Sequence, residues 1–508
     1  MNQQFNQNNK QKKTIYYDGS CPMCVVIIDK VDGSLQKEKF NPKDITKELF
    51  PRNFTKKQAE EEIHLIDSDG KVYKNAEAIL KIIEEYPRWK FLAKIGRLPI
   101  IKQLLPIGYK LVAVNRHFIF GPASRIFWLK IVVVGGLIAG LLLSFKLWTE
   151  ERFFPHTPVL DNFPAIPPSV ETILFIILLG LLVAIFILPK PQKFIFSALF
   201  VATIFAFFDQ MRWQPWFYQY FFILATISLF SWNYSDTEKR QAVLNTSRLI
   251  VASIYFFSGL QKINFVFMAD IFPWMIEPIV KLFPVPLQIF PLSLGIIVPF
   301  LEMGIGLGLL SKKCRKYAIV FVLLMLSFVL ITLGPLGHNW NSVVWPWNVA
   351  MALFAVILFW QAENFSFWDI LWVKNFSFQK IILILFVVMP VLSFFNLWDS
   401  YLSATLYSGN TNSAQVYISD SVKQKLPMEI QRYVVKTETG ESMLDFFNWS
   451  FAELNVPPYP ETRIYKNIAR DICKYADDKM DVVLVVNSKP TLFNRDNQLI
   501  YDCSNYTY

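Results

Sequence analysis

The first residues whose types and spacing suit chemistry are two cysteines placed three positions apart. Cys21 and Cys24 stand in the stretch TIYYDGSCPMCVVIIDK, residues 14–30. The β-branched and aromatic residues before them predict a buried strand, and the Gly-Ser pair predicts a turn. A helix is expected from Pro22 to about Gln36, because proline is tolerated in the first turn of a helix. The motif thus stands where a strand passes into a helix.

Three kinds of chemistry fit this pair. At a helix N-terminus the partial positive charge stabilises a thiolate on Cys21, and Cys24 can then resolve a mixed disulfide. Two inert buried cysteines are the second interpretation, which the intervening proline disfavours. A zinc clip is the third, and it would need two further ligands that no spacing signature supplies. We favour a redox pair and predict no metal site.

Ionisable residues inside long apolar segments form a second group of candidates. Lys262 lies near the end of the apolar segment 247–263, and Glu302 lies well inside the segment 288–310. Charged groups are costly within a membrane and are therefore candidates for function. The alternative for Lys262 is a side chain that snorkels to the membrane surface. For Glu302 we expect a buried partner.

Three more polar residues fall in predicted turns on the same, outer side as Lys262. Asp209 and Arg212 lie in FFDQMRWQPWFYQY, and His338 lies in GHNWNSVVWPWN. A polar cluster of these residues, roofed by tryptophans, is expected to hold a small molecule at the membrane edge. The alternatives are a capped turn with a surface ion pair for Asp209 and Arg212, and an interfacial aromatic belt for the tryptophans.

The composition is that of a membrane protein. The chain has 508 residues, of which 53% are hydrophobic, with 47 Phe and 15 Trp. Its mean hydropathy is +0.33, which is too apolar for a soluble enzyme of this size. The net charge is +10. We attribute it to Lys and Arg residues in the N-terminal region and in short loops that face the cytoplasm, and we therefore expect lipid rather than nucleic acid as a partner. Five cysteines are too few for a scaffold built on disulfides.

The pattern along the chain predicts a multi-domain membrane protein. We expect a disordered tail at 1–13, a compact α/β domain with a basic connector at 14–125, a polytopic helical bundle at 126–396, and a small soluble α+β domain at 397–508. In the first domain IHLIDSDGKVYKN predicts a hairpin, and AEAILKIIEEY predicts a helix. About nine spans are predicted in the bundle: 127–148, 170–189, 193–208, 216–232, 247–263, 288–310, 317–335, 343–360 and 379–396.

The charges of the loops predict the orientation. Loops such as LPKPQK and SKKCRKY are basic, whereas TEERFFPHTPVLDNFPAIPPSVE and GPLGHNWNSVVWPW have few Lys or Arg. This asymmetry is the positive-inside pattern and places the N-terminus in the cytoplasm and the C-terminal domain outside a bacterial inner membrane. In an oxidising compartment Cys473 and Cys503 of that domain can form a structural disulfide. Cys314, in a basic loop, is expected to be inert.

Two stretches resemble known families. YYDGSCPMC, the hairpin region and RLPIIKQLLPIGYKLVAVNRHFIFG resemble the DCC family of thioredoxin-like proteins over about 14–120. The resemblance implies a thioredoxin-like fold, thiol-disulfide oxidoreductase chemistry, and a signature made of Asp18, Cys21 and Cys24. We therefore add Asp18 to the residues predicted to bind substrate.

YFFSGLQKIN and VVWPWNVAM, with FFDQMRWQPWFY as a weaker third, resemble the horizontally transferred transmembrane (HTTM) domain over about 200–355. That domain is shared with vitamin K-dependent γ-carboxylases. In those enzymes the motif similar to SGLQKIN carries a lysine that acts as a base on the reduced vitamin. The resemblance places this role on Lys262.

Three functions follow as hypotheses. The first is a membrane oxidoreductase with Cys21 and Cys24 as catalytic residues, whose bundle binds a quinone-like or lipid-borne partner. No cofactor is certain; a quinone is the candidate. The second is a carboxylase-like enzyme that modifies a peptide or protein with Lys262 as base. The third is a scaffold or transporter without catalysis. Asp209, Arg212, Glu302 and His338 are the predicted binding residues of the bundle.

Overall fold

The computed structural model divides into two compact units, residues 1–128 and 129–508. Each unit is described by itself. The residues whose structure is described are 12–19, 21–34, 37–47, 62–87, 89–98, 101–103, 105–110, 112, 124–149, 151–160, 166–230, 232, 236–284, 294–362, 365–489 and 498–506.

The first unit is built on a four-stranded sheet of order β2-β1-β3-β4. Strand β1 (Lys13–Tyr17) pairs in parallel with β2 (Phe40–Asp44) and antiparallel with β3 (His64–Ile66), which forms a hairpin with β4 (Val72–Lys74). The helices are α1 (Pro22–Asp32), the short η1 (Lys37–Lys39), α3 (Asn75–Glu84) and α4 (Lys90–Gly96).

The strand, the hairpin and the two helices predicted from the sequence are therefore present, with α1 ending at Asp32 rather than Gln36. Strand β2 was not predicted, because FNPKD contains a proline and two charged residues and shows no apolar run. It pairs with β1 along one side only, where a proline is tolerated. Of the predicted tail, residues 1–11 lie outside the described residues, and Lys13 already begins β1.

The core of this unit joins the sheet to its helices. Ile15 of β1 and Leu65 of β3 are fully buried and pack with Ile28 of α1 and Ile82 of α3. These positions alternate along the strands and recur at helical spacing, which is the pattern that predicted the elements. The packing fixes the junction between β1 and α1, where the two cysteines lie.

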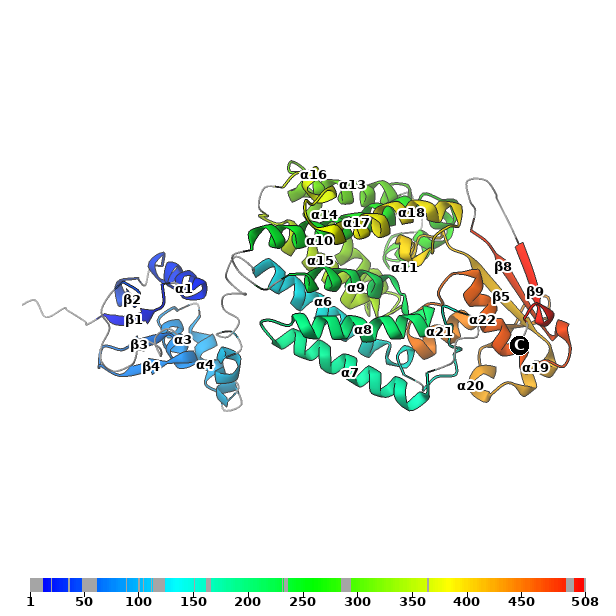
Figure 1. Cartoon of the computed structure of the whole chain (residues 1–508), viewed down its shortest axis with the longest axis horizontal. Helices are drawn as coiled ribbons and strands as arrows, with labels where there is room; N and C mark the ends of the chain where they lie inside the picture. The colour runs from blue at the N-terminus through cyan, green and yellow to red at the C-terminus, as the bar shows by residue number, and fades with distance from the viewer. Residues whose placement is uncertain are drawn as a thin grey trace, which may run out of the picture. The chain divides into compact units, whose positions relative to one another are not determined.

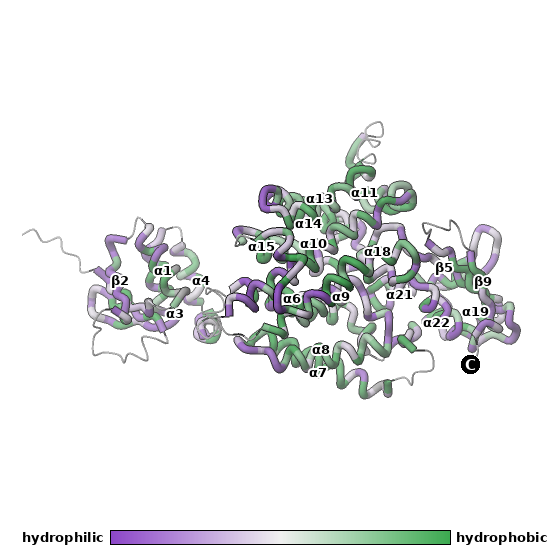
Figure 2. The backbone as a smooth tube through the Cα atoms, turned by 45° about the horizontal axis from the view of Figure 1, so that its top comes forward, coloured by the Kyte–Doolittle hydropathy of each residue, from purple (hydrophilic) through white to green (hydrophobic). Residues whose placement is uncertain are grey.

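The second unit is a bundle of mostly hydrophobic helices (Figures 1 and 2). Its principal helices are α6 (Ser124–Leu143, which begins in the first unit), α7 (Pro168–Ile187), α8 (Gln192–Phe208), α9 (Pro215–Ser228), α10 (Thr237–Gln261), α11 (Phe272–Val280), α13 (Val298–Leu310), α14 (Arg315–Leu333), α15 (Val344–Phe359), α17 (Ser377–Leu383) and α18 (Met389–Leu392). Shorter helical segments are the 3₁₀ helices η2 (Phe145–Leu147), η3 (Gln210–Arg212), η6 (Leu294–Ile296) and η8 (Ser393–Phe395), the π-helices η4 (Phe267–Ile271) and η7 (Ile384–Val388), and the α-helix α16 (Phe367–Leu371).

Five helical segments among the described residues are long and apolar enough to cross a membrane. They are Ser124–Leu143, Ser169–Ile187, Thr237–Gln261, Arg315–Leu333 and Ser377–Phe395. Three shorter apolar helices, Gln192–Phe208, Leu294–Leu310 and Val344–Phe359, fall on further predicted segments. The chain is therefore a candidate membrane protein, whereas the number of nine spans stays a prediction.

The C-terminal part of this unit contains a five-stranded sheet of order β6-β7-β5-β8-β9. Its strands are β5 (Ser413–Ile418), β6 (Val434–Lys436), β7 (Ser442–Leu444), β8 (Val482–Asn487) and β9 (Gln498–Asp502). Its helices are α19 (Asp420–Lys425), α20 (Met428–Gln431), α21 (Phe446–Leu454) and α22 (Thr462–Cys473), with the turns η9 (Tyr401–Ser403), η10 (Lys479–Asp481) and η11 (Cys503–Asn505).

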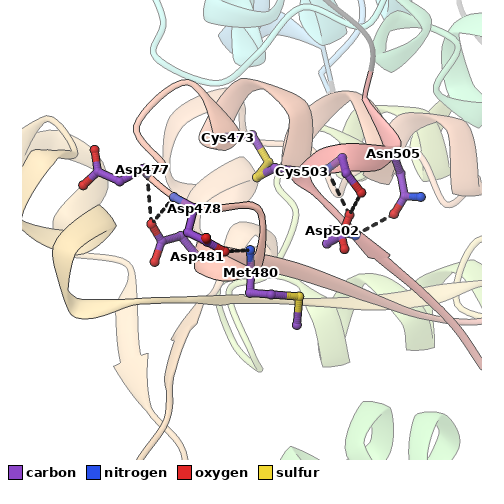
Figure 3. The surroundings of a disulfide bond; sticks show 9 residues. Cys473, Asp477, Asp478, Met480, Asp481, Asp502, Cys503 and Asn505 are labelled. Atoms are coloured by element: carbon purple, nitrogen blue, oxygen red, sulfur yellow. Dashed lines mark hydrogen bonds between the residues drawn. A yellow bond between two sulfur atoms is a disulfide. The ribbon is translucent and has the colours of Figure 1, made fainter.

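A disulfide between Cys473 and Cys503 joins the end of α22 to the turn after β9 (Figure 3). Polar contacts tie this region to the bundle: Glu453 accepts from the backbone N–H groups of Phe153 and Phe154, and Asn264 donates to the carbonyl of Ser408. The sheet region and the bundle are consequently one compact unit, while the sequence-based boundary at residue 397 stays a prediction.

Candidate functional sites

The cysteine motif lies at the junction of β1 and α1. Cys21 occupies the N-cap position of α1, and its sulfur accepts a hydrogen bond from the backbone N–H of Cys24 at 3.4 Å. The backbone N–H of Cys21 donates to the carbonyl of Asp18 at 3.0 Å. Cys21 Sγ therefore lies at the positive end of the helix, the position that favours a thiolate. Figure 1 shows α1 beside the sheet strands of this unit.

The turn before the motif is held by Asp44 at the end of β2. The Asp44 carboxylate accepts from the backbone N–H of Gly19 at 3.0 Å and from the Thr46 hydroxyl at 2.6 Å. Burial opposes ionisation, but these hydrogen bonds hold the pKa of Asp44 below its usual value. A Cβ on Gly19 would lie 2.0 Å from Asp44 Oδ2, so the close approach requires glycine. This partner of the Asp-Gly-Ser-Cys turn was missed by sequence reasoning because β2 was missed.

Both sulfurs are covered in this structure. Cys21 has an exposed fraction of 0% and Cys24 of 4%, and they pack against Tyr17 and Ile27. No disulfide joins them. Asp18, predicted to bind substrate, is also buried. A disulfide substrate can reach Cys21 only after some of the covering side chains move.

In the bundle the structure brings Lys262 and Glu302 together. Lys262 Nζ lies 2.8 Å from Glu302 Oε2, and it also donates to the Ser258 hydroxyl at 2.6 Å and to the Ser258 carbonyl at 3.2 Å. Both charged residues are buried. The three hydrogen bonds match the three donors of an ammonium group. Glu302 thus has the buried partner expected from the sequence, and Lys262 is not a snorkelling side chain.

Glycines on two helices make this pair possible. A Cβ on Gly259 of α10 would lie 2.4 Å from the carbonyl oxygen of Pro299, and one on Gly306 of α13 would lie 2.8 Å from the backbone N of Phe256. The backbones of α10 and α13 therefore touch, as small residues allow in membrane helices. Lys262, one turn after Gly259, meets Glu302 because of this approach.

A cavity of about 400 Å³ opens beside the pair. Its polar end is formed by Lys262, Glu302, Ser258 and Tyr255, with Asn348 and Tyr407 nearby. The remaining wall is mostly apolar, and much of it comes from four helices and the segment after η9. It includes Met275 on α11, Val298 and Leu301 on α13, Phe321, Leu324, Met325 and Phe328 on α14, Val344 and Met351 on α15, and Leu406 after η9. A pocket of this size, apolar with a few converging polar groups, is typical of a small-molecule site.

Two features of this cavity point to a ligand. The Tyr255 hydroxyl is buried and has no hydrogen-bond partner among the described residues, and a buried hydroxyl without a partner is costly. In addition, Leu324 of the candidate span α14 lines the cavity and is itself 62% exposed. The cavity therefore extends to a face of α14 that would contact lipid. Tyr255 was not among the predicted site residues, although it shares a helical face with Lys262.

Asp209 and Arg212 belong to a different network. Arg152 donates to Asp209 at 2.6 Å, Arg212 forms a short ion pair with Glu171, and the Asp209 and Arg212 side chains approach to 4.0 Å. Burial opposes the charge of Asp209, but Arg152 and Arg212 hold its pKa at about 2. Neither Asp209 nor Arg212 is among the residues that line the Lys262 cavity. Glu171, an acid in a predicted span, was the sequence signal for this network.

His338 does not line the cavity but contacts it indirectly, through Trp274. Its ring stacks on Trp274 at 4.6 Å between centroids, and its Nε2 lies 2.6 Å from the Trp274 carbonyl. The Trp274 ring in turn lies beside the ring of Tyr407, a residue that lines the cavity, with 6.4 Å between the ring centroids. The structure thus separates the predicted polar cluster into the Lys262–Glu302 pair, the Asp209–Arg212 network and His338. Their roles in binding or catalysis stay predictions.

Comparisons with known proteins bear on the first unit. Comparison with curated proteins and with solved structures found no match. The resemblance of the bundle to the HTTM domain stays a prediction. Residues 15–122 match the family model described as DCC1-like thiol-disulfide oxidoreductase.

Proposed function

We propose that the chain is a membrane-bound thiol-disulfide oxidoreductase whose bundle binds a quinone-like or lipid-borne molecule. The observation that carries this proposal is the position of Cys21 Sγ at the N-terminus of α1, bonded to the N–H of Cys24, within the stretch that matches the oxidoreductase family. The apolar helices supply the membrane part.

The exchange reaction uses only the two cysteines. The Cys21 thiolate attacks one sulfur of a substrate disulfide, the S–S bond breaks, and the leaving thiolate takes a proton. The Cys24 thiolate then attacks Cys21 Sγ, forms the Cys21–Cys24 disulfide and releases the second substrate thiol. In this direction the two electrons and two protons of the dithiol pass to the substrate, which leaves as two thiols. In the reverse direction the Cys21–Cys24 disulfide oxidises two substrate thiols, and the dithiol that forms would then pass two electrons and two protons to a quinone, which becomes a quinol.

The test of the exchange uses the full chain in detergent, with Cys314→Ser as the background because that thiol is exposed. A small aromatic disulfide serves as the substrate, and release of its thiol is followed by absorbance. Cys21→Ser should abolish exchange, and Cys24→Ser should stop at a mixed disulfide on Cys21 that mass spectrometry detects. Unchanged release from the Cys21→Ser protein would refute the redox assignment.

The cavity carries the second part of the proposal. Lys262, Glu302 and Tyr255 offer an ammonium, a carboxylate and a hydroxyl at one end of an apolar space that extends toward the lipid-facing surface. A ring with carbonyl oxygens and an apolar tail suits this distribution, because one oxygen can accept from the Tyr255 hydroxyl while the tail stays among apolar side chains. A second oxygen can accept from Lys262 by replacing its longest bond, the one to the Ser258 carbonyl at 3.2 Å.

Binding is tested with a short-chain benzoquinone. The protein to compare is the double variant Lys262→Met with Glu302→Gln, since a single change would leave one buried charge unpaired at a cost of roughly 3–5 kcal/mol. Hydrogen bonds to charged groups contribute about 1.5–3 kcal/mol, so the affinity of the double variant should fall at least about tenfold. An unchanged affinity contradicts the assignment of this cavity.

The buried ion pair also favours a second candidate, a membrane enzyme that modifies a peptide or protein. Lys262 can give a proton to, and after deprotonation take one from, a group bound at the polar end, with Glu302 next to it. In that case the Lys262→Met and Glu302→Gln protein loses activity while Cys21→Ser retains it. Retained cellular function in both proteins would instead favour a scaffold or transporter.

We place the chain in a bacterial inner membrane with the first unit in the cytoplasm and the C-terminal sheet region outside. Basic loops on one side support this orientation. The Cys473–Cys503 disulfide supports it as well, because disulfides persist in oxidising compartments, whereas the Cys21 and Cys24 sulfurs are not joined.

A further inference from the structure

The segment 89–98 of the first unit presents large apolar side chains to solvent. Trp89 and Phe91 are each 55% exposed, Leu98 is 52% exposed, and Ile95 is 43% exposed. Scattered apolar residues on a surface are ordinary, but a contiguous group on one short helix marks an interaction site. This group lies on α4 and the residues that flank it.

The orientation of α4 is fixed by its small residues. Ala93 is fully buried, and a Cβ on Gly96 would lie 2.7 Å from Leu80 of α3, so this face of α4 packs closely against the domain. At about 100° per residue, Phe91, Ile95 and Leu98 fall on the opposite side of the helix. The apolar face of α4 therefore points away from the domain that holds it.

The charged residues of the segment that carries this face are all of one sign. The stretch WKFLAKIGRLPIIKQLLPIGYKLV, residues 89–112, contains five Lys and Arg residues and no Asp or Glu. Lys90 and Lys94 are exposed beside the apolar face, and Lys102 and Lys110 are exposed further along. Arg97 is paired with Glu84 of α3. An apolar face flanked by lysines is complementary to a surface that is apolar inside and negative outside.

We propose that this face, defined by Phe91, Ile95 and Leu98 with Lys90 and Lys94, docks the redox unit on an anionic lipid surface. The chain itself ties this unit to a candidate span, because α6 begins at Ser124, twenty-six residues after Leu98. Twenty-six residues reach at most about 90 Å when extended, so the face stays within that distance of the start of the span. The aromatic and aliphatic side chains would enter the headgroup region, and the lysines would contact lipid phosphates.

The proposal is tested by hydrogen exchange on the full chain in nanodiscs that hold one copy each. Amides of 89–98 should exchange at least about tenfold more slowly in discs of phosphatidylglycerol than in discs of phosphatidylcholine or in detergent. Replacing Lys90 and Lys94 with Gln should weaken docking about fivefold per residue, and Phe91→Ser with Ile95→Ser should remove the protection. Lys423→Gln with Lys425→Gln, on α19, is the matched control and should change nothing.

These outcomes separate the occupants of the face. Equal protection in every lipid and in detergent would mean that the protein's own bundle covers α4, and equal absence of protection would mean that nothing does; either result overturns the proposal. The substituted side chains are exposed, so the fold is expected to survive, and an unchanged thermal unfolding midpoint checks this. The result does not depend on exchange activity at Cys21.

Discussion

At the scale of single residues, the most informative atom in the bundle is the Tyr255 hydroxyl. Most buried polar atoms of the described chain have partners, as they do around Lys262, where three hydrogen bonds satisfy the ammonium group. Tyr255 is buried beside that pair and its hydroxyl has none. A donor that is already desolvated gains more from a ligand than one that must first leave water.

Replacing Tyr255 with Phe should separate binding from stability. No hydrogen bond among the described residues is lost, so the thermal unfolding midpoint is expected to stay within about 1 °C of the unchanged protein. The affinity for a short-chain benzoquinone should fall about two- to tenfold, which corresponds to one hydrogen bond. The measurement is a binding titration followed by thermal unfolding.

Tyr220→Phe is the matched control. Tyr220 on α9 is equally buried, and its hydroxyl also has no described partner, but it does not line the cavity. Its loss should leave both affinity and stability unchanged. Equal effects of the two substitutions on binding would argue against a ligand at Tyr255.

Asp209 is expected to make the stability of the bundle depend on pH in the acidic range. Arg152 and Arg212 hold its pKa at about 2, below the value of roughly 3.9 in an unfolded chain. Between these two pKa values the unfolded state therefore binds more protons than the folded state. The stabilisation by Asp209 is complete above about pH 5 and is lost as the pH falls from about 4 to 2. A single such group contributes about 2 kcal/mol.

The measurement is thermal unfolding in detergent from pH 5 to pH 2, with Asp209→Asn as the comparison. The Asn variant should be less stable at pH 5, because two buried guanidinium groups lose a partner, and its stability should fall less steeply toward pH 2. Parallel curves for the two proteins would show that Asp209 is not held ionised by Arg152 and Arg212.

At the scale of elements, the ion pair depends on how closely two helices approach. Gly259 on α10 and Gly306 on α13 bring the backbones into contact, and Lys262 and Glu302 face each other across the same interface. Gly259→Ala would place a methyl group 2.4 Å from the Pro299 carbonyl. The helices must then separate, which should cost about 1–3 kcal/mol and lengthen the Lys262–Glu302 contact.

Gly304→Ala on α13 provides the control, since a Cβ there meets nothing within 4 Å. It should leave the unfolding midpoint and benzoquinone affinity unchanged, while Gly259→Ala lowers both. If the two alanine variants behave alike, close packing of α10 on α13 is not what positions the pair.

Periodicity and composition predict the local features of this chain. Apolar length predicted where helices lie, and the strand, turn and proline around Cys21 predicted the strand-helix junction, because both are local properties of the chain. Partners across the bundle were harder to predict. Asp209, Arg212 and Lys262 were all assigned to one side of the membrane, an assignment that stays a prediction and that does not say which side chains meet.

Which side chains meet depends on the direction in which each helix face points, and that is decided by packing. Lys262 met Glu302 because of glycines on two helices, whereas Arg212 met Glu171 from a helix whose acid had not been considered. Strand β2, with its proline and charged residues, is held by its neighbour β1 rather than by its own propensity. Such nonlocal causes leave no pattern in a single sequence.

At the scale of the whole molecule, the two kinds of sulfur chemistry require different surroundings. Cys473 and Cys503 form a disulfide across 30 positions of the chain, which in the chain-entropy view contributes about 3–4 kcal/mol. Cys21 and Cys24 are not joined and match an exchange family. A chain that keeps both states is expected to place them on opposite sides of a membrane.

Cys314 offers a direct test of that orientation. It is exposed in the basic loop between α13 and α14, which the charge pattern places in the cytoplasm. Cys21 and Cys24 are buried, and Cys473 and Cys503 are bonded to each other, so none of these four should react quickly with a bulky maleimide.

A membrane-impermeant maleimide should therefore leave the protein unlabelled in intact spheroplasts and label it once the membrane is permeabilised. The Cys314→Ser protein should stay unlabelled in both samples, which identifies the reacting thiol. Adding a reductant to intact spheroplasts should make Cys473 and Cys503 reactive if the C-terminal region is outside. Labelling of Cys314 without permeabilisation would reverse the orientation and place the Cys21 unit on the outer side.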